Sequence, residues 1–255
     1  MRRLGCLVIA DEVLGGHVHE SNSHWLAKEL RPLGLKLARV EVCSDDLPDI
    51  EATVRRFAKD LNLDYVITSG GLGPTPDDRT MQGLAKGLGL RLVLTPENEA
   101  WMRERTRIGH RLGYFESPEP NPGLLKMAWL PEGAEAMPNE LGTALGAIVT
   151  VPPRPVTFFT LPGVPAEFYR MFRESVAPRL ARSTPLHVEE LVLFTEESRF
   201  YGTLAKLEKE FPDVVLGSYP ERGQIRIRAT GPEKQAKELI ARMREAGKAY
   251  LSPAR

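Results

Sequence analysis

"VITSGGLGPTPDD", residues 66–78, joins a β-type run to a loop that is dense in glycine, proline and aspartate. The run over 64–71 predicts a strand, and the apolar spacing over 80–90 predicts the helix that follows it. Glycines after a strand permit unusual dihedral angles and let a ligand approach the backbone N–H groups. The stretch is neither a P-loop nor a G-x-G-x-x-G fingerprint. Its spacing alone leaves two interpretations open: an anion-binding loop, or a turn in which Asp78 caps the helix.

Strands and helices alternate on both sides of this stretch. Continuous apolar runs predict strands over 4–10 and 35–42, and amphipathic patterns predict helices within 21–34 and 46–61. Such alternation is typical of an α/β fold, a parallel sheet with helices on both faces. The sequence also predicts a helix over 96–108, a loop over 113–123, β-runs over 146–151 and 155–163, and a helix over 164–180.

Acidic residues stand where the predicted strands end. Asp11 and Glu12 follow the first strand, Asp45 follows the second, and Asp77 and Asp78 lie in the glycine loop. Because ligands of such sheets bind beyond the carboxyl ends of the strands, we expect these residues to converge. They are candidates for binding a divalent cation or activating a nucleophile, with helix capping as the alternative.

The C-terminal part has a different pattern. Residues from about 185 onward predict the order strand, helix, strand, strand, helix, so we expect domains at 1–182 and 183–255. Strict alternation over 224–230 predicts a half-buried strand, which favours Arg226 and Arg228 as solvent-facing residues over a nucleic-acid surface.

Composition excludes several classes of protein. The chain has 42% hydrophobic and 27% charged residues, with 34 basic and 34 acidic side chains, so nucleic acid and membrane are not expected partners. No apolar run reaches the roughly 18 residues of a membrane span. The N-terminal residues are more typical of a first core strand than of a signal peptide, so we expect a cytoplasmic protein. Cys6 and Cys43 are expected as buried thiols. The histidines over 17–24 are interpreted as a surface loop rather than a metal site.

Four stretches together resemble a known family. "IADEVLGGHVHESNSHWLAKEL", "SGGLGPTPDDRT", "KMAWLPEGAEAMPNELGTALG" and "LPGVPAEFYRMF" are similar, in order and spacing, to the N-terminal domain of the competence/damage-inducible CinA proteins, which is related to MogA and MoaB. The resemblance implies a three-layer, mainly parallel sheet with a mixed edge, of the molybdopterin-binding type. The second domain resembles a small α+β, KH-like domain without the GxxG clamp, so RNA binding is not expected. Since the chain ends at Arg255, the deamidation performed by the C-terminal domain of CinA proteins is not expected either.

The resemblance implies a small-molecule ligand, a nucleotide or a pterin. CinA-like domains are linked to metal-dependent hydrolysis of the ADP-ribose pyrophosphate, a similar domain of FAD synthases to FAD hydrolysis, and MogA-like relatives to adenylylation of molybdopterin. Asp45 and Asp78 match the key acids of the family, which implies catalytic and metal-binding roles for them, with Asp77 beside them. The implied cofactors are Mg²⁺, Mn²⁺ or Co²⁺, with K⁺ as a further candidate and molybdopterin as an alternative ligand. A homo-oligomer, dimer or trimer, is implied as well.

The substrate-binding residues that the resemblance implies lie in the stretches that match the family. They are Asp11, Glu12, Ser69, Gly70, Gly71, Leu72, Gly73, Thr75, Asn139, Gly142, Thr143, Gly163, Val164 and Pro165. Four positions, Ala10, Glu20, Leu145 and Val164, depart from the family pattern. Glu20 adds a carboxylate that would repel phosphate or recruit a metal. These departures keep a third reading open, a non-catalytic pterin- or nucleotide-binding protein.

Overall fold

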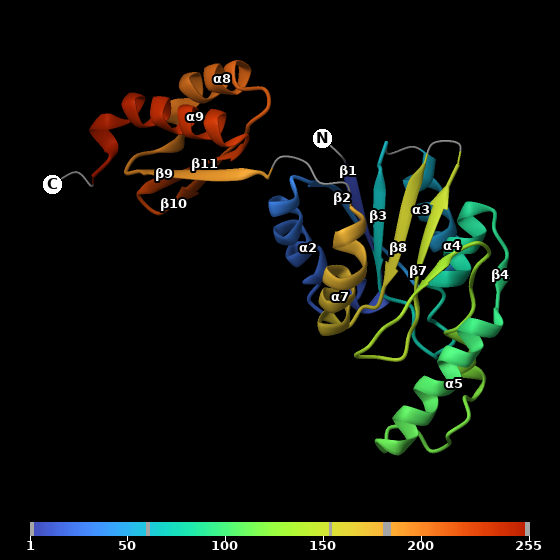
Figure 1. Ribbon diagram of the computed structural model, residues 1–255. Helices are drawn as coiled ribbons and strands as arrows, with labels where there is room; N and C mark the ends of the chain where they lie inside the picture. The colour runs from blue at the N-terminus through green and yellow to red at the C-terminus, as the bar shows by residue number, and fades with distance from the viewer. Residues whose placement is uncertain (1–2, 60–61, 153–154, 181–184, 253–255) are drawn as a thin grey trace. The chain divides into compact units, whose positions relative to one another are not determined.

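The structure, a computed structural model, describes residues 3–59, 62–152, 155–180 and 185–252 (Figure 1). The chain divides into two compact units, Met1–Leu30 with Lys36–Ala181, and Arg31–Leu35 with Arg182–Arg255. The domain boundary expected near residue 183 lies outside the described residues.

The first unit contains a six-stranded sheet, and its order of strands is β2-β1-β3-β8-β7-β6. β2, β1, β3 and β8 are parallel, whereas β7 pairs antiparallel with β8 and, at the edge, with β6. The predicted fold class, a mainly parallel sheet with a mixed edge, is therefore confirmed. The strands are β1 (Arg3–Ile9), β2 (Lys36–Cys43), β3 (Tyr65–Ser69), β6 (Glu135–Met137), β7 (Gly146–Val151) and β8 (Val156–Leu161).

Helices cover both faces of this sheet. α2 and α7 lie together on one face and α3 and α4 on the other, while α5 extends away from the sheet (Figure 1). Gly34, with a φ angle of 70°, follows the 3₁₀ turn Arg31–Leu33, and Gly89, with a φ angle of 72°, ends α4 one residue before the end of the predicted helix. The helices are α1 (Asp11–Leu14), α2 (Asn22–Leu30), α3 (Leu47–Lys59), α4 (Thr80–Leu88), α5 (Pro96–Arg111), α6 (Pro122–Lys126) and α7 (Pro165–Met171).

Two predicted segments differ from the structure. The helix expected over 164–180 is α-helical only over α7 and continues as a π-helical turn, Phe172–Val176, and a 3₁₀ turn, Ala177–Arg179. Pro178 explains the change, because its ring disfavours α-helical geometry in the residues before it. The loop expected over 113–123 ends earlier than predicted, since Asn121 caps α6 by accepting a hydrogen bond from Leu124 N.

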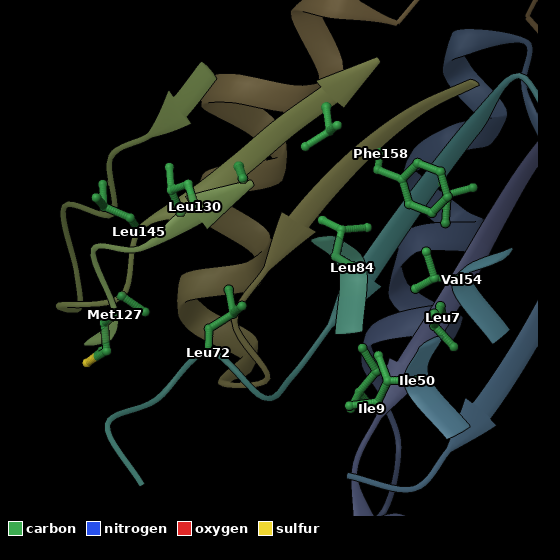
Figure 2. Close-up of a cluster of buried hydrophobic side chains, with 14 of the residues drawn as sticks. Leu7, Ile9, Ile50, Val54, Leu72, Leu84, Met127, Leu130, Leu145 and Phe158 are labelled. Carbon is green, nitrogen blue, oxygen red and sulfur yellow. The ribbon is translucent and has the colours of Figure 1, made fainter. Parts of the chain in front are cut away.

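The core of the first unit fills the space between the sheet and the α3–α4 layer. Leu7, Ile50, Val54 and Phe158 are completely buried there. Figure 2 shows Leu72, Met127, Leu130 and Leu145 grouped at one end of this cluster, away from Leu7, Ile50 and Val54. The core therefore reaches the loops that follow the sheet, and it supports them with apolar contacts.

Both cysteines are buried, as predicted. Cys6 and Cys43 are free thiols on β1 and β2, exposed by 0% and 4%. Burial raises the pKa of both groups above the ordinary thiol value, that of Cys43 to about 12. Neither thiol is therefore a ready nucleophile.

The second unit has an antiparallel sheet in the order β10-β11-β9, packed against α9. Ile225, Ile227 and Ala229 of β11 are buried, whereas the alternating Arg226 and Arg228 are not, which confirms the half-buried strand. Both arginines form ion pairs with glutamates. The elements are β9 (His187–Leu193), α8 (Tyr201–Glu210), β10 (Val215–Glu221), β11 (Gln224–Gly231) and α9 (Glu233–Ala246). Among the described residues of the chain, no helix has the length and apolar character needed to cross a membrane.

Candidate functional site

A cavity of about 700 Å³ lies in the first unit where β1, β3 and β8 end. Most of its walls come from four segments that are distant in sequence, 8–22, 69–78, 142–144 and 162–167, and Asp45, Phe115, Leu124 and Met127 complete them. The sequence argument that strand ends converge at one edge is therefore realised. The predicted residues that line the cavity are Glu12, Asp45, Ser69, Gly70, Gly71, Leu72, Gly73, Asp77, Asp78, Gly142, Thr143, Gly163, Val164 and Pro165.

The glycine loop has a backbone that other residues could not adopt. Gly70 and Gly71 have φ angles of +101° and +64°. A Cβ atom at Gly70 would lie 2.3 Å from the Ile9 carbonyl oxygen, so the loop lies directly against the end of β1. No described residue accepts a hydrogen bond from the amides of Gly71, Leu72 and Gly73. Three backbone donors are thus available beside the cavity.

The loop that follows β8 lies against the glycine loop. A Cβ atom at Gly163 would stand 3.4 Å from the Gly70 Cα, and Gly70 N donates a 3.1 Å hydrogen bond to Leu161 O. Pro165 occupies the first turn of α7, as predicted from its fixed φ angle. Within the described part of the chain, the amides of Gly163 and Val164 also have no acceptor. The two loops therefore present their free N–H groups in one cavity.

Asn22, which the sequence reasoning did not select, connects these loops. It is the first residue of α2 and 5% exposed, and its Nδ2 donates 2.9 Å hydrogen bonds to Ser69 Oγ and to Gly163 O. Its Oδ1 is buried without a partner among the described residues. The sequence contained one signal for Asn22, because it lies two residues after Glu20, a position that departs from the family pattern.

Asp78 closes the glycine loop rather than capping α4. Its Oδ2 accepts hydrogen bonds from Thr75 N at 2.9 Å and Thr75 Oγ1 at 2.6 Å. The residue before α4 is Arg79, which makes no side-chain cap. The capping alternative is therefore wrong for Asp78. From α6, Lys126 Nζ donates to the carbonyl oxygens of Thr75 and Asp78 and holds the same turn from its other side.

Asp45 and Asp11, which follow β2 and β1, are joined by two hydrogen bonds between the backbone N–H of each and the carboxylate of the other. Asp11 N donates to Asp45 Oδ2 at 2.8 Å, and Asp45 N donates to Asp11 Oδ1 at 3.4 Å. Partial burial raises the pKa of Asp45, and the charges of Asp11, Glu12 and Asp77 raise it further, against the lowering effect of the Asp11 amide. The raised pKa therefore reflects burial first, and the neighbouring carboxylates add to it.

Three predicted binding residues do not line the cavity. Asp11 and Thr75 instead support Asp45 and Asp78 through the hydrogen bonds above. Asn139 is 1% exposed, and its side chain accepts from Leu141 N and Gly142 N while donating to Glu167 Oε2 at 2.6 Å. These three residues do not line the cavity, and they support the residues that do through hydrogen bonds.

The cavity is acidic. Its walls contain six carboxylates, Glu12, Glu20, Asp45, Asp77, Asp78 and Glu167. In the parts of the chain that the structure describes, no lysine or arginine lines it. The Glu20 carboxylate is already engaged, because it accepts hydrogen bonds from Ser23 N and Ser23 Oγ at the start of α2. An anionic ligand would therefore find backbone amides and the His19 imidazole, but no lysine or arginine among the described lining residues.

The residues present are compatible with a hard divalent cation. Asp45 and Asp78 each direct one carboxylate oxygen to an internal hydrogen bond and keep a second oxygen. Carboxylate oxygens are the ligands that Mg²⁺ and Mn²⁺ prefer. Within residues 3–59, 62–152, 155–180 and 185–252, no three His, Cys, Asp or Glu side chains are grouped closely enough to hold a metal by themselves. A bound cation would thus take further ligands from water or from a bound small molecule, as Mg²⁺ commonly does.

Comparison with known proteins identifies the family. Residues 5–182 match the family described as "Probable molybdopterin binding domain". The chain belongs to this family. The second unit of this molybdopterin-binding-type protein matches the FAD synthase middle domain over residues 185–230.

Relatives of this molybdopterin-binding-type protein include CinA-like proteins, which confirms the resemblance. Protein TK1472 of Thermococcus kodakarensis is 37% identical over 215 residues, which cover 84% of this chain and 84% of that protein. A CinA-like protein of Escherichia coli O17:K52:H18 is 35% identical over 247 residues, which cover 94% of this chain and 58% of that protein. A crystal structure of CinA from Thermoplasma acidophilum, described as of unknown function, has a TM-score of 0.59 and 29% identity over 68% of this chain and 94% of that chain.

Proposed function

We propose that this protein hydrolyses the pyrophosphate of a nucleotide such as ADP-ribose or FAD, with a divalent cation as cofactor. One observation carries the proposal: a cavity with two sets of backbone amides that have no described acceptor is lined by six carboxylates and, among the described residues, by no lysine or arginine. Amides select a phosphate-bearing ligand, and the carboxylates require a cation between themselves and that ligand. A pyrophosphate with bound metal satisfies both conditions.

Different residues have different roles in the proposed reaction. The amides of Gly71, Leu72 and Gly73 bind phosphate oxygens, and those of Gly163 and Val164 bind from the opposite loop. Asp45 and Asp78 would hold the divalent cation, which would supply neutralisation of the charge on the phosphates. Asp77 lies in the cavity wall, where its carboxylate accepts the proton of the attacking water.

The bond changes follow from the substrate. The water oxygen bonds to one phosphorus, and the bond from that phosphorus to the bridging oxygen breaks. The bridging oxygen leaves with the second phosphate, so ADP-ribose yields AMP and ribose 5-phosphate, and FAD yields AMP and FMN.

The test is release of AMP by the purified full-length protein from ADP-ribose and from FAD, with Mg²⁺, Mn²⁺ or Co²⁺ and with EDTA. We expect metal-dependent release that falls about 100-fold or more in Asp45→Asn and Asp77→Asn. Glu208→Gln is the matched control, since Glu208 is an exposed carboxylate on α8 of the second unit. Undiminished turnover in both aspartate variants would refute the assignment.

A second candidate is adenylylation of molybdopterin, which the family membership favours. The same amides would then hold the phosphates of ATP and of the pterin. Incubation with molybdopterin and ATP separates the two reactions, because adenylylation releases pyrophosphate and attaches AMP to the pterin. Ligand binding without turnover in every assay would leave a non-catalytic binding protein.

A further inference from the structure

A second hollow of about 490 Å³ lies behind the glycine loop, next to the phosphate-binding cavity. Five residues line both spaces: Gly71, Leu72, Gly73, Asp78 and Met127. The loop assigned above to the phosphates is therefore a wall that the two hollows share. If the phosphates of a ligand lie on this loop, the part of the ligand that is attached to the phosphates can extend into the second hollow.

The second hollow differs chemically from the first. Most of its walls are apolar side chains contributed by α4, β4 (Leu92–Val93), α6 and the segments that follow it. Figure 2 shows three of these side chains, Leu72, Met127 and Leu145, close together at the end of the core. The apolar lining residues are Leu72, Met81, Leu92, Pro122, Leu125, Met127, Trp129 and Leu145.

The polar groups of this hollow are few. Gln82 of α4 offers an amide that can both donate and accept a hydrogen bond. Lys126 is the only basic side chain among the described lining residues, and its Nζ is held by the carbonyl oxygens of the 75–78 turn. Trp129 is 40% exposed, so part of its indole is open to stacking. Apolar walls with a few oriented polar groups are the usual form of a small-molecule site.

We propose that this hollow binds the planar heteroaromatic base of the nucleotide whose phosphates lie on the glycine loop. The inference rests on the proposed function for the position of the phosphates, and it adds the part of the ligand that determines specificity. A flat aromatic ring can pack against the apolar walls and stack on the Trp129 indole. The Gln82 amide can form hydrogen bonds with the edge of the ring. Sugars and free phosphate are too polar for such walls.

The test measures equilibrium binding by calorimetry to the full-length protein with Mn²⁺. The probes are AMP, FMN, ribose 5-phosphate and inorganic pyrophosphate. The variants are Trp129→Ala and Gln82→Leu, and Gln235→Leu on α9 is the matched control, since it is also a half-buried helical glutamine. Circular dichroism verifies that each variant is folded.

We expect Trp129→Ala to weaken binding of a base-containing probe between about 5- and 150-fold, the range for loss of one stacked base, and Gln82→Leu to weaken it less. Binding of pyrophosphate and ribose 5-phosphate should remain unchanged. The probe that responds, AMP or FMN, identifies adenine or isoalloxazine as the occupant.

Unchanged affinity for both AMP and FMN in Trp129→Ala and Gln82→Leu would overturn the inference. Failure of the proposed function looks different: the wild-type protein would not bind pyrophosphate. If adenosine, which has no phosphate, still lost affinity in Trp129→Ala, the base site would stand without the phosphate site.

Discussion

At the scale of single residues, the glycine loop is determined by close backbone contacts. Gly71 combines a φ angle of +64° with a position where a Cβ atom would lie 2.3 Å from Thr80 Oγ1. Thr80 cannot withdraw freely, because it is completely buried and its Oγ1 donates a 2.8 Å hydrogen bond to Gly70 O. The loop therefore needs glycine both for its dihedral angle and for its space.

Gly71→Ala should lower the free energy of unfolding by about 2–4 kcal/mol, since it adds a steric clash to the strain of a positive φ angle. Gly89→Ala is the control, because Gly89 has a φ angle of +72° but nothing within 4 Å of its Cβ position. The control should cost only about 1–2 kcal/mol. Urea unfolding measures both, and equal losses would show that the contact with Thr80 is unimportant.

The charge of Asp45 should make stability depend on pH. Its pKa is raised in the folded protein, so the native state holds the proton more tightly than the unfolded state. The stabilisation is present at low pH and is lost as the pH rises through the raised pKa. Asp45→Asn, which stays neutral, should therefore melt at a higher temperature than the wild type at pH 7 in EDTA, and this difference should shrink toward pH 4.

Asp46→Asn is the control for this pH experiment, because Asp46 is the neighbouring, exposed carboxylate with a side-chain exposure of 65%. It should change the melting temperature little at either pH. A lower melting temperature of Asp45→Asn at pH 7 would contradict the predicted cost of burying this charge beside other carboxylates.

At the scale of elements, the site depends on how the ends of β3, β8 and α2 are joined. Asn22 makes this junction with hydrogen bonds to Ser69 and Gly163, and the Gly70–Gly163 backbone contact completes it. The junction sets the separation of the two amide-bearing loops. Under the proposed function, the separation of these two loops should decide which phosphate-bearing ligand fits.

Asn22→Ala should lower the free energy of unfolding by about 1–3 kcal/mol, because it leaves buried partners without a donor. It should also weaken binding of pyrophosphate with Mn²⁺, since the two loops lose their common link. Asn98→Ala is the matched control, a buried asparagine on α5 that does not line the cavity. If both variants bind pyrophosphate like the wild type, Asn22 has no positioning role.

The sequence predicted the elements whose pattern is long and regular. The parallel strands, α2 to α5 and the half-buried β11 follow from hydrophobic periodicity, and the glycine loop follows from its restricted backbone. α1, β4 (Leu92–Val93), β5 (Leu130–Pro131) and β6 were missed, because two to four residues carry no period. Asn22 and the second hollow were missed since they arise from contacts between segments that are far apart in sequence.

At the scale of the whole molecule, the candidate site belongs to one unit. Every residue that lines the two hollows lies in the first unit, whereas the second unit has its own core around Leu193, Ile227 and Leu239. Ligand binding and the stability of the second unit should therefore be separable.

Ile227→Ala should destabilise the second unit by about 2–5 kcal/mol, because Ile227 is completely buried in its core. Binding of pyrophosphate with Mn²⁺ should stay within about twofold of the wild type at a temperature where both units are folded. Differential scanning calorimetry and binding calorimetry measure the two effects. A large loss of binding would show that the site depends on the second unit.

The most direct measurement of the central claim is the affinity for inorganic pyrophosphate with and without a divalent cation. An acid-lined cavity whose phosphate donors are backbone amides should bind pyrophosphate with Mn²⁺ and at least about 100-fold more weakly in EDTA, because the carboxylates repel the anion. Asp45→Asn should reduce this dependence on metal. Equally tight binding in EDTA, or no binding with any divalent cation, would contradict the account.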